Sequence, residues 1–226
     1  LGSKHAEAVV EHGGLAIVAD IDYPKAQESA NKINKKRVRE GLAIPCYVDI
    51  TKKETIEHAA SLFDKIDVLI NNAGTNPSGG YLMDVEISRV QKTWDVNLLG
   101  PLLWTRAAVK AGLTESVINV ASVGGIKPAT YMGAYNISKA GLIYMTKQLA
   151  KELAPNIRVN GIAPAVVKTK LSEMLWENDE QATADLHALK KLGTPEDISN
   201  LMYFLSSEEA SWITGEVVTI DGGYLL

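Results

Sequence analysis

The chain is poor in the features of disulfide-linked, membrane-spanning and polyanion-binding proteins. Its one cysteine, Cys46, excludes an internal disulfide framework and fits a reducing, cytoplasmic compartment. No apolar run is long enough to cross a bilayer as a helix, so we expect no membrane partner. Acidic residues outnumber basic ones, 27 to 23, and the net charge of −4 argues against nucleic acid as a partner.

Aromatic residues and metal-ligand patterns are also scarce. Aromatic side chains make up 6% of the chain, and its four histidines show no metal-ligand spacing, so we predict no metal site. Hydrophobic residues make up 46% and charged residues 22%, which is typical of an ordinary globular protein. A length of 226 residues suits one large α/β domain with a single core.

Short apolar runs alternate with helical patterns along the whole chain. The runs are typical of buried parallel strands, and we predict strands near residues 15–19, 44–48, 67–70, 116–120, 158–163 and 217–220. This alternation predicts an α/β fold, a doubly wound parallel sheet between two layers of helices. The basic run at residues 32–39 is interpreted as a solvated helix end rather than a phosphate site.

Polar or turn residues follow five of the predicted strands, namely Asp20, Asp49, Asn72, Ser122 and Pro164. Ligands of open parallel sheets bind outside the carboxyl ends of the strands, where the strand order switches. These five residues therefore predict a ligand-binding crevice at that edge of the sheet.

One helical stretch, residues 134–141, carries a pair with chemical meaning. Tyr135 and Lys139 are four residues apart, so on a helix they lie on one face. A phenol has an ordinary pKa of about 10, and an ammonium beside it should lower that pKa towards neutrality. The pair would then give and take a proton in a carbonyl–alcohol interconversion. The spacing alone would fit a surface tyrosine beside a solvated lysine better, so its interpretation depends on the rest of the chain.

Several motifs together resemble the classical short-chain dehydrogenase/reductase (SDR) family. Ser122 stands 13 residues before Tyr135, as in that family. The other matches, in family order, are Asn71-Asn72-Ala73-Gly74, Asn97, Tyr135-x-x-x-Lys139, Ile157-Arg158-Val159-Asn160, Pro164-x-x-Val167-x-Thr169 and Asp221-Gly222-Gly223. The resemblance covers nearly the whole chain. It implies that residues 1–226 form a single Rossmann-like NAD(P)-binding domain in three α/β/α layers.

The resemblance also assigns catalytic roles. Tyr135 would be the acid/base, Lys139 would lower its pKa and bind the nicotinamide ribose, and Ser122 would hold the substrate oxygen. Asn97 would hold a water that links Lys139 to solvent. Taken singly, Asn97 would more often be a helix-capping or buried hydrogen-bonding residue, and Ser122 a turn residue.

The cofactor-binding residues follow from the same resemblance. They are Gly2, Asp20, Ile21, Asp49, Ile50, Asn72, Ala73, Gly74, Tyr135, Lys139, Pro164, Val167 and Thr169. A carboxylate at Asp20 would accept hydrogen bonds from free ribose hydroxyls and repel a 2′-phosphate, so NAD(H) is favoured over NADP(H). Asp20 could instead be a turn residue with Lys25 nearby, and Asp49 could cap the following helix.

The predicted activity is NAD(P)-dependent interconversion of a secondary alcohol and a ketone, as in the family's carbonyl reductases. A 3-oxoacyl-thioester reductase using NADPH and a catalytically idle nucleotide-binding scaffold are the alternatives. A sugar-nucleotide epimerase is disfavoured because few residues follow Thr169. Residues 75–80 and 171–181 would cover a small-molecule substrate, with Tyr131 near it. The resemblance further implies a homodimer or homotetramer.

Some family segments have no counterpart in the sequence. The first family strand and most of the Gly-rich phosphate loop are missing, and Gly2 matches the last glycine of that loop. The chain also looks short around residues 63–65 and 110–115. We therefore expect a longer natural chain than the 226 residues printed.

Overall fold

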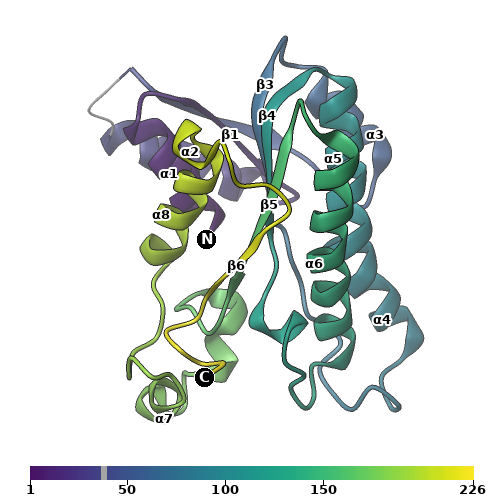
Figure 1. Cartoon of the computed structure of the whole chain (residues 1–226), viewed down its shortest axis with the longest axis vertical. Coiled ribbons are helices and arrows are strands. Elements are labelled where there is room, and N and C mark those ends of the chain that lie inside the picture. Colours follow the sequence, from purple (N-terminus) through teal and green to yellow (C-terminus); the bar gives the residue numbers. More distant parts are fainter. Residues whose placement is uncertain (37–39) are drawn as a thin grey trace.

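The computed structural model describes residues 1–36 and 40–226, and in it helices and strands alternate as expected (Figure 1). Arg37 and Arg39 of the predicted basic run lie outside the described residues. The strands are β1 (Leu15–Asp20), β2 (Leu42–Tyr47), β3 (Ile66–Asn71), β4 (Leu113–Val120), β5 (Arg158–Pro164) and β6 (Val217–Ile220). The α-helices are α1 (Gly2–Glu11), α2 (Tyr23–Lys36), α3 (Lys53–Ala60), α4 (Ile87–Trp94), α5 (Gly100–Lys110), α6 (Gly133–Leu153), α7 (Glu180–Asp185) and α8 (Pro195–Ser206). Short helical turns are η1 (Asp95–Leu99), η2 (Val123–Gly125), η3 (Lys170–Leu175) and η4 (Glu208–Ala210).

All described strand pairs are parallel, and they form two sheets. β1 pairs with β2, while the second sheet has the order β3-β4-β5-β6. The predicted parallel α/β architecture is confirmed. The sheet is not continuous, because none of the described strands pairs with both β1 and β3.

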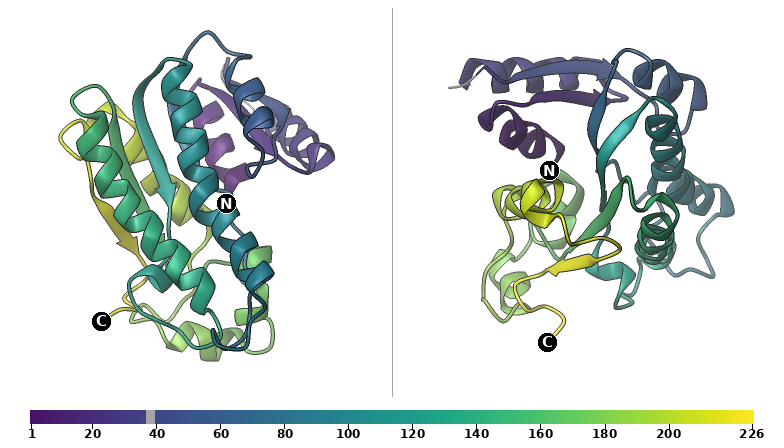
Figure 2. Two further views of the ribbon diagram at one scale, coloured as in Figure 1. Left: turned by 90° about the vertical axis from the view of Figure 1, so that its right-hand side faces the viewer. Right: turned by 45° about the horizontal axis from the view of Figure 1, so that its top comes forward.

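Helices cover both faces of the larger sheet (Figures 1 and 2). Successive side chains of a strand point to opposite faces, so adjacent residues of β4 meet different helices. Val117 packs in one cluster with Ala108 of α5 and Leu149 of α6. Ile118 packs in another with residues of α8, among them Met202. These two clusters hold the strand ends of the larger sheet in place between the layers.

The two-stranded sheet is joined to the rest of the molecule through α1. A cluster of small and branched side chains packs α1 and α2 against β1 and β2. On its other side, α1 contacts α8, where the Ser199 hydroxyl donates to the Lys4 carbonyl at 2.9 Å. The Lys4 ammonium also bridges Glu7 and Glu196, each at 2.7 Å. α1 therefore fixes the first βα units beside the C-terminal part of the chain.

The helical segments α4 and α5 form one continuous run, joined by the π-helical turn η1. Pro101 lies in the first turn of α5, directly after the π-helical turn. Single π-turns inside α-helices are often found at functional sites. Here the turn carries Asn97, whose side chain is fully buried.

Within the described ranges, no helix has both the length and the apolar composition required to span a bilayer.

Candidate active site

Tyr135 and Lys139 lie on the buried face of α6, near its first turn. Their exposed fractions are only 9% and 3%. The Lys139 Nζ atom lies 5.7 Å from the centre of the Tyr135 ring, as a cation over an aromatic face. It also donates a hydrogen bond to the Val120 carbonyl at the end of β4, at 2.7 Å. The lysine is therefore fixed between the helix and the strand end, and it is not a solvated surface residue.

Burial acts on the pKa values of both side chains. Loss of solvation lowers the pKa of the Lys139 ammonium to about 8. It raises the pKa of the Tyr135 phenol, and a hydrogen bond with the Ser122 side chain offsets part of that rise. The expected lowering of the Tyr135 pKa is therefore wrong for this structure. Desolvation of the phenolate is the largest cause, and the Lys139 ammonium is directed to the Val120 carbonyl.

Ser122 reaches Tyr135 because two glycines follow it. Its hydroxyl caps η2 by accepting from the Gly124 amide at 3.1 Å, and its side chain also lowers the pKa of Tyr135. A Cβ atom on Gly124 would lie 2.4 Å from Asn136 Oδ1, and one on Gly125 would lie 2.7 Å from the backbone of α6. Only glycine lets this turn pack directly against the helix. Ser122 is thus both a turn residue and a partner of Tyr135.

Asn97 connects α6 to the loop that follows β3. Its Oδ1 accepts from the Thr75 amide at 2.8 Å, and its Nδ2 donates to the Thr75 carbonyl and to Ser138 Oγ at 2.9 and 3.1 Å. Ser138 Oγ in turn donates to the Tyr135 carbonyl at 2.7 Å. The side-chain amide is therefore a buried hydrogen-bonding group, one of the alternatives raised by its sequence. In this arrangement the Asn97 side chain joins the loop after β3 to α6.

The backbone at Gly74 lies beside the side chains of Lys139 and Asn97. A Cβ atom there would lie 3.5 Å from Lys139 Nζ and 3.7 Å from Asn97 Oδ1, so a longer side chain would occupy the space next to the lysine. Gly2, at the start of α1, packs on Asn72, where a Cβ would lie 2.9 Å from Nδ2. Gly2, Asn72 and Gly74 are thus brought to the same edge as Lys139, with Ala73 exposed between the last two.

Asp20 ends β1 and Asp49 follows the neighbouring strand β2 by two residues, and the Asp20 carbonyl accepts from the Val48 amide at 3.0 Å. Asp20 is exposed and accepts from the Asp22 amide at 2.9 Å, which makes it a turn residue with an accessible carboxylate. The Asp49 carboxylate is bonded to the Thr51 hydroxyl at 2.7 Å, and this bond lowers its pKa. Asp49 does not cap α3, whose N-cap is Lys52.

The remaining predicted cofactor residues divide between exposed and packed positions. Ile21 is exposed, whereas Ile50 packs against Gly100 at the start of α5. Pro164 is buried at the end of β5. Beyond it, Val167 is buried and pairs with Gly193, and Thr169 caps η3 through its contact with Ser172. Val167 and Thr169 therefore shape the loop through packing and capping.

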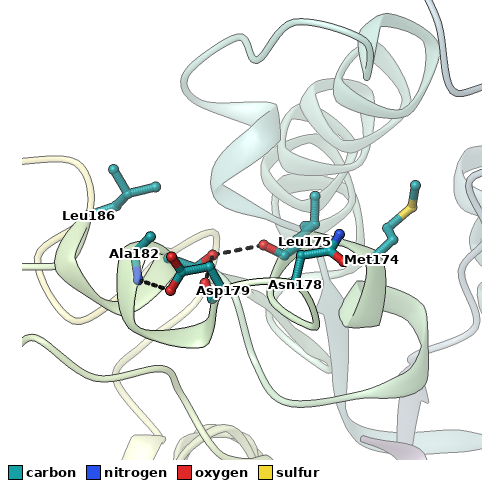
Figure 3. A pocket seen from close by; sticks show the side chains of 7 residues that line it. Met174, Leu175, Asn178, Asp179, Ala182 and Leu186 are labelled. Carbon is teal, nitrogen blue, oxygen red and sulfur yellow. Dashed lines mark hydrogen bonds between the residues drawn. The ribbon is translucent and has the colours of Figure 1, made fainter.

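The segment after this loop carries a hollow of about 380 Å³ (Figure 3). Its lining comes from η3 and α7 and is formed by Met174, Leu175, Asn178, Asp179, Ala182, Thr183 and Leu186. Asp179 caps α7 by accepting from the Ala182 amide at 2.9 Å, and the Thr183 hydroxyl donates to the Leu175 carbonyl at 2.8 Å. An ion pair between Lys168 and Glu180 at 2.6 Å joins the two ends of the segment. Hydrogen bonds and an ion pair thus hold the segment predicted to cover the substrate, residues 171–181, around an apolar hollow.

One residue of the site escaped prediction, Ser138, while Thr75 was predicted only as part of the loop 75–80 that would cover the substrate. Ser138 stands three residues after Tyr135, on the same helix face, and this spacing could have drawn notice. Its partner Asn97 is 41 residues away in the chain, and no local pattern reports that contact. The described residues hold no cluster of three or more histidine, cysteine or acidic side chains suited to a metal ion.

Known proteins are similar to this chain over nearly its whole length. A family model described as enoyl-(acyl carrier protein) reductase matches residues 1–225. The chain is 36% identical to the human protein "Dehydrogenase/reductase SDR family member 4" over 235 residues, covering 99% of this chain and 83% of that one.

Solved structures are similar over the same extent. A short-chain type dehydrogenase/reductase from Mycobacterium marinum has a TM-score of 0.90 and 31% identity, with 99% of this chain and 90% of that chain covered. The structure of ElxO with NADP bound has a TM-score of 0.88 and 27% identity, with 99% and 94% covered. The likeness therefore extends over both layers of helices and the strand ends between them.

Proposed function

We propose that this chain, which belongs to the short-chain dehydrogenase/reductase family, interconverts a secondary alcohol and a ketone with NAD(H), using Tyr135 as the acid/base. Membership of the family makes it an oxidoreductase that uses a nicotinamide cofactor and acts on small molecules. The alcohol–ketone chemistry, the role of Tyr135 and the preference for NAD(H) are the proposal.

One observation carries the proposal: the buried Tyr135 phenol, whose pKa Ser122 influences, has the Lys139 ammonium 5.7 Å from its ring centre. Such a set of groups can hold a carbonyl oxygen near two hydroxyls and give it a proton. A surface tyrosine with a solvated lysine would not show this burial of both side chains.

The residues present fit a nicotinamide cofactor. Gly74 keeps the space beside Lys139 free of a side chain, and Asp20 presents an exposed carboxylate at the end of β1. Lys139 and Asn72 would hold the nicotinamide half, and Gly2 and Asp20 the adenosine half. When bound, the nicotinamide supplies the hydride for reduction or accepts it in oxidation.

The proton is handled by the protein. In ketone reduction, Ser122 Oγ would hold the substrate oxygen, and Tyr135 Oη would donate its proton to that oxygen as the carbonyl carbon gains the hydride. Burial raises the pKa of Tyr135, so at neutral pH the phenol carries the proton that reduction consumes. Lys139, with a pKa of about 8, is mostly charged at pH 7 and would stabilise the phenolate left behind. Asn97 acts as a positioning residue through Thr75 and Ser138.

Calorimetric titration of the full-length protein, with an intact N-terminus, with NADH and with NADPH tests the cofactor assignment. Tighter binding of NADH would support Asp20 as the selecting group, and a screen of ketones with NADH would follow. Tighter binding of NADPH would favour the 3-oxoacyl-thioester reductase. Binding of neither would contradict the proposal and leave the idle scaffold.

A further inference from the structure

A second cavity, of about 230 Å³, lies between the loop after β5, the start of α8 and the turn after β6. Its lining combines buried apolar side chains with exposed residues, among them Lys191 and Asn200, so one side of the cavity is open to solvent. Among its described lining residues there is none of the four predicted catalytic residues. The cavity is therefore a place for a ligand that does not contact Tyr135 or Lys139.

One imidazole in the lining has a nitrogen without a partner. His187, 1% exposed, lines the cavity, and its Nδ1 lies 3.0 Å from the Thr183 carbonyl oxygen. A carbonyl can only accept, so Nδ1 carries the hydrogen, and in the neutral ring Nε2 is then an acceptor. Within the described part of the chain this Nε2 atom is buried and has no hydrogen-bond partner. An unpaired buried acceptor is costly, and a hydroxyl that donates to it would remove that cost.

Neighbouring groups hold the His187 ring in place. The Leu189 amide donates to the Gly222 carbonyl at 3.0 Å, which ties the segment after α7 to the last turn of the chain (Figure 1). The Asp221 carboxylate accepts from two amides of that turn, each at 2.9 Å. A Cβ on Gly222 would lie 3.7 Å from His187 Cδ2, and the Tyr224 ring centre lies 5.3 Å from the imidazole centre. The imidazole is thus already in position before any ligand binds, as is usual for small-molecule sites.

The inner wall of the cavity is otherwise apolar. Val167, Leu192 and Ile198 are each at most 5% exposed. Cavities of about 150 Å³ with such walls take up benzene, so this larger one has room for a ring with a small substituent. The two carboxylates of the lining, Asp197 and Asp221, accept hydrogen bonds within their own turns. The inner end therefore suits a neutral ligand better than an ion.

We propose that this cavity is a second small-molecule site, which binds a small neutral alcohol or phenol through a hydrogen bond from the ligand hydroxyl to His187 Nε2. The apolar body of the ligand packs against Val167, Leu192 and Ile198, where its burial supplies most of the affinity. The site uses neither the nicotinamide cofactor nor Tyr135. It is therefore independent of the proposed oxidoreductase activity, and either can be wrong without the other.

Phenol and toluene are suitable probes, because they have nearly the same size and only phenol carries a hydrogen-bond donor. We would titrate both into the full-length protein and follow binding by NMR, with the histidine ring nitrogens labelled. Phenol should bind saturably and shift the His187 Nε2 resonance. In His187→Phe, which keeps an aromatic ring and loses the acceptor, phenol binding should weaken about three- to tenfold relative to toluene binding. His58→Phe, at an exposed histidine, is the matched control and should leave that ratio unchanged.

Two results would overturn the proposal. One is the absence of saturable phenol binding, as expected if Nε2 only binds a water molecule. The other is phenol binding that leaves the His187 Nε2 resonance unmoved and keeps the same ratio to toluene in His187→Phe, as expected for binding elsewhere on the protein. Thermal unfolding checks that the variants are folded. If His187→Phe is not, the Nε2 resonance of the wild type decides, because phenol should shift it and toluene should shift it much less.

Discussion

Among the single residues, burial shifts the pKa values of Tyr135 and Lys139 in opposite directions. Removing solvent disfavours the phenolate and the ammonium alike, so the pKa of the tyrosine rises and that of the lysine falls. The result is a protonated phenol beside a lysine that is still mostly charged at pH 7. This combination suits proton donation to a carbonyl oxygen, the direction of ketone reduction.

Tyr135→Phe tests the acid/base role directly. The variant keeps the ring against Lys139 and loses the proton that the reaction needs. We expect turnover of a ketone to fall by about 10² to 10⁴-fold, the usual contribution of general acid catalysis, with NADH affinity nearly unchanged. Steady-state kinetics and calorimetry measure the two quantities. Turnover close to that of the wild type would refute the assignment.

Asp20 carries the prediction of cofactor choice. Its exposed carboxylate would repel a 2′-phosphate, so Asp20→Asn should tighten NADPH binding relative to NADH by about tenfold. Glu28→Gln, another exposed acid a few residues along the chain, is the control and should leave the ratio unchanged. Calorimetric titration of both variants checks this. An unaltered ratio in Asp20→Asn would show that another group selects the cofactor.

At the scale of elements, the short turn η2 decides how close Ser122 comes to α6. Gly124 and Gly125 let the turn rest on the helix backbone, and the π-turn η1 presents Asn97 to the same helix. The turns η2 and η1 therefore each bring one site residue, Ser122 and Asn97, next to α6. Elements in direct contact transmit small displacements, which matter when reacting atoms must be placed within fractions of an ångström.

Gly125→Ala should displace that turn. Its Cβ would lie 2.7 Å from the backbone of α6, a distance that requires the turn to move. We expect a loss of about 1 to 3 kcal/mol in the free energy of unfolding and a clear drop in kcat. Gly79→Ala is the matched control, since nothing lies within 4 Å of its Cβ position. Urea unfolding and kinetics compare the two, and equal behaviour would contradict the close approach.

At the scale of the whole molecule, α1 connects the two-stranded sheet to α8 and the larger sheet. It does so through apolar packing, the Lys4 ion pairs with Glu7 and Glu196, and the bond between Ser199 and the helix backbone. The same helix buries His5 at 2% exposure, with neither ring nitrogen hydrogen-bonded. Burial lowers the pKa of His5 from 6.5 to about 4, so the folded protein disfavours its charged form.

This histidine makes stability depend on pH. Between pH 6.5 and 4 the unfolded chain binds the His5 proton more readily than the folded one, so stability falls as the pH is lowered through that window. In His5→Leu this loss should be smaller by about 3 kcal/mol between pH 7 and pH 4. Urea unfolding at both pH values measures it. His58→Leu, at an exposed site, should behave as the wild type, and an equal pH response in His5→Leu would contradict the prediction.

The homodimeric or homotetrameric state and the cytoplasmic location stay predictions. Exposed apolar side chains fit an interface on the outer faces of α5 and α6, among them Tyr144 at 71% exposure. Trp212, before β6, is 99% exposed. Sedimentation of the protein in solution would decide the assembly.

The sequence by itself determined the α/β class, the order of its elements and the residue types at the strand ends. Apolar periodicity and turn residues are local signals, so the runs that become β1, β4 and β5 could be recognised without a structure. The start of α8 could also be recognised from the sequence, because the capping Thr194 and the proline after it act within one helical turn. Helix geometry alone placed Tyr135 and Lys139 on one face, while their chemical interpretation depended on the other motifs of the chain.

Only the tertiary structure decided what these residues contact and how they are charged. The direction of the Tyr135 pKa shift depends on burial by distant segments, so the local argument from Lys139 gave the opposite sign. Hydrogen bonds link the Asn97 side-chain amide to Thr75 and Ser138, and the Tyr131 hydroxyl to the Tyr81 hydroxyl. The partners are 22 to 50 positions apart in the sequence. Contacts of that range form only when separate strands and helices pack together, and no window of the sequence contains both partners.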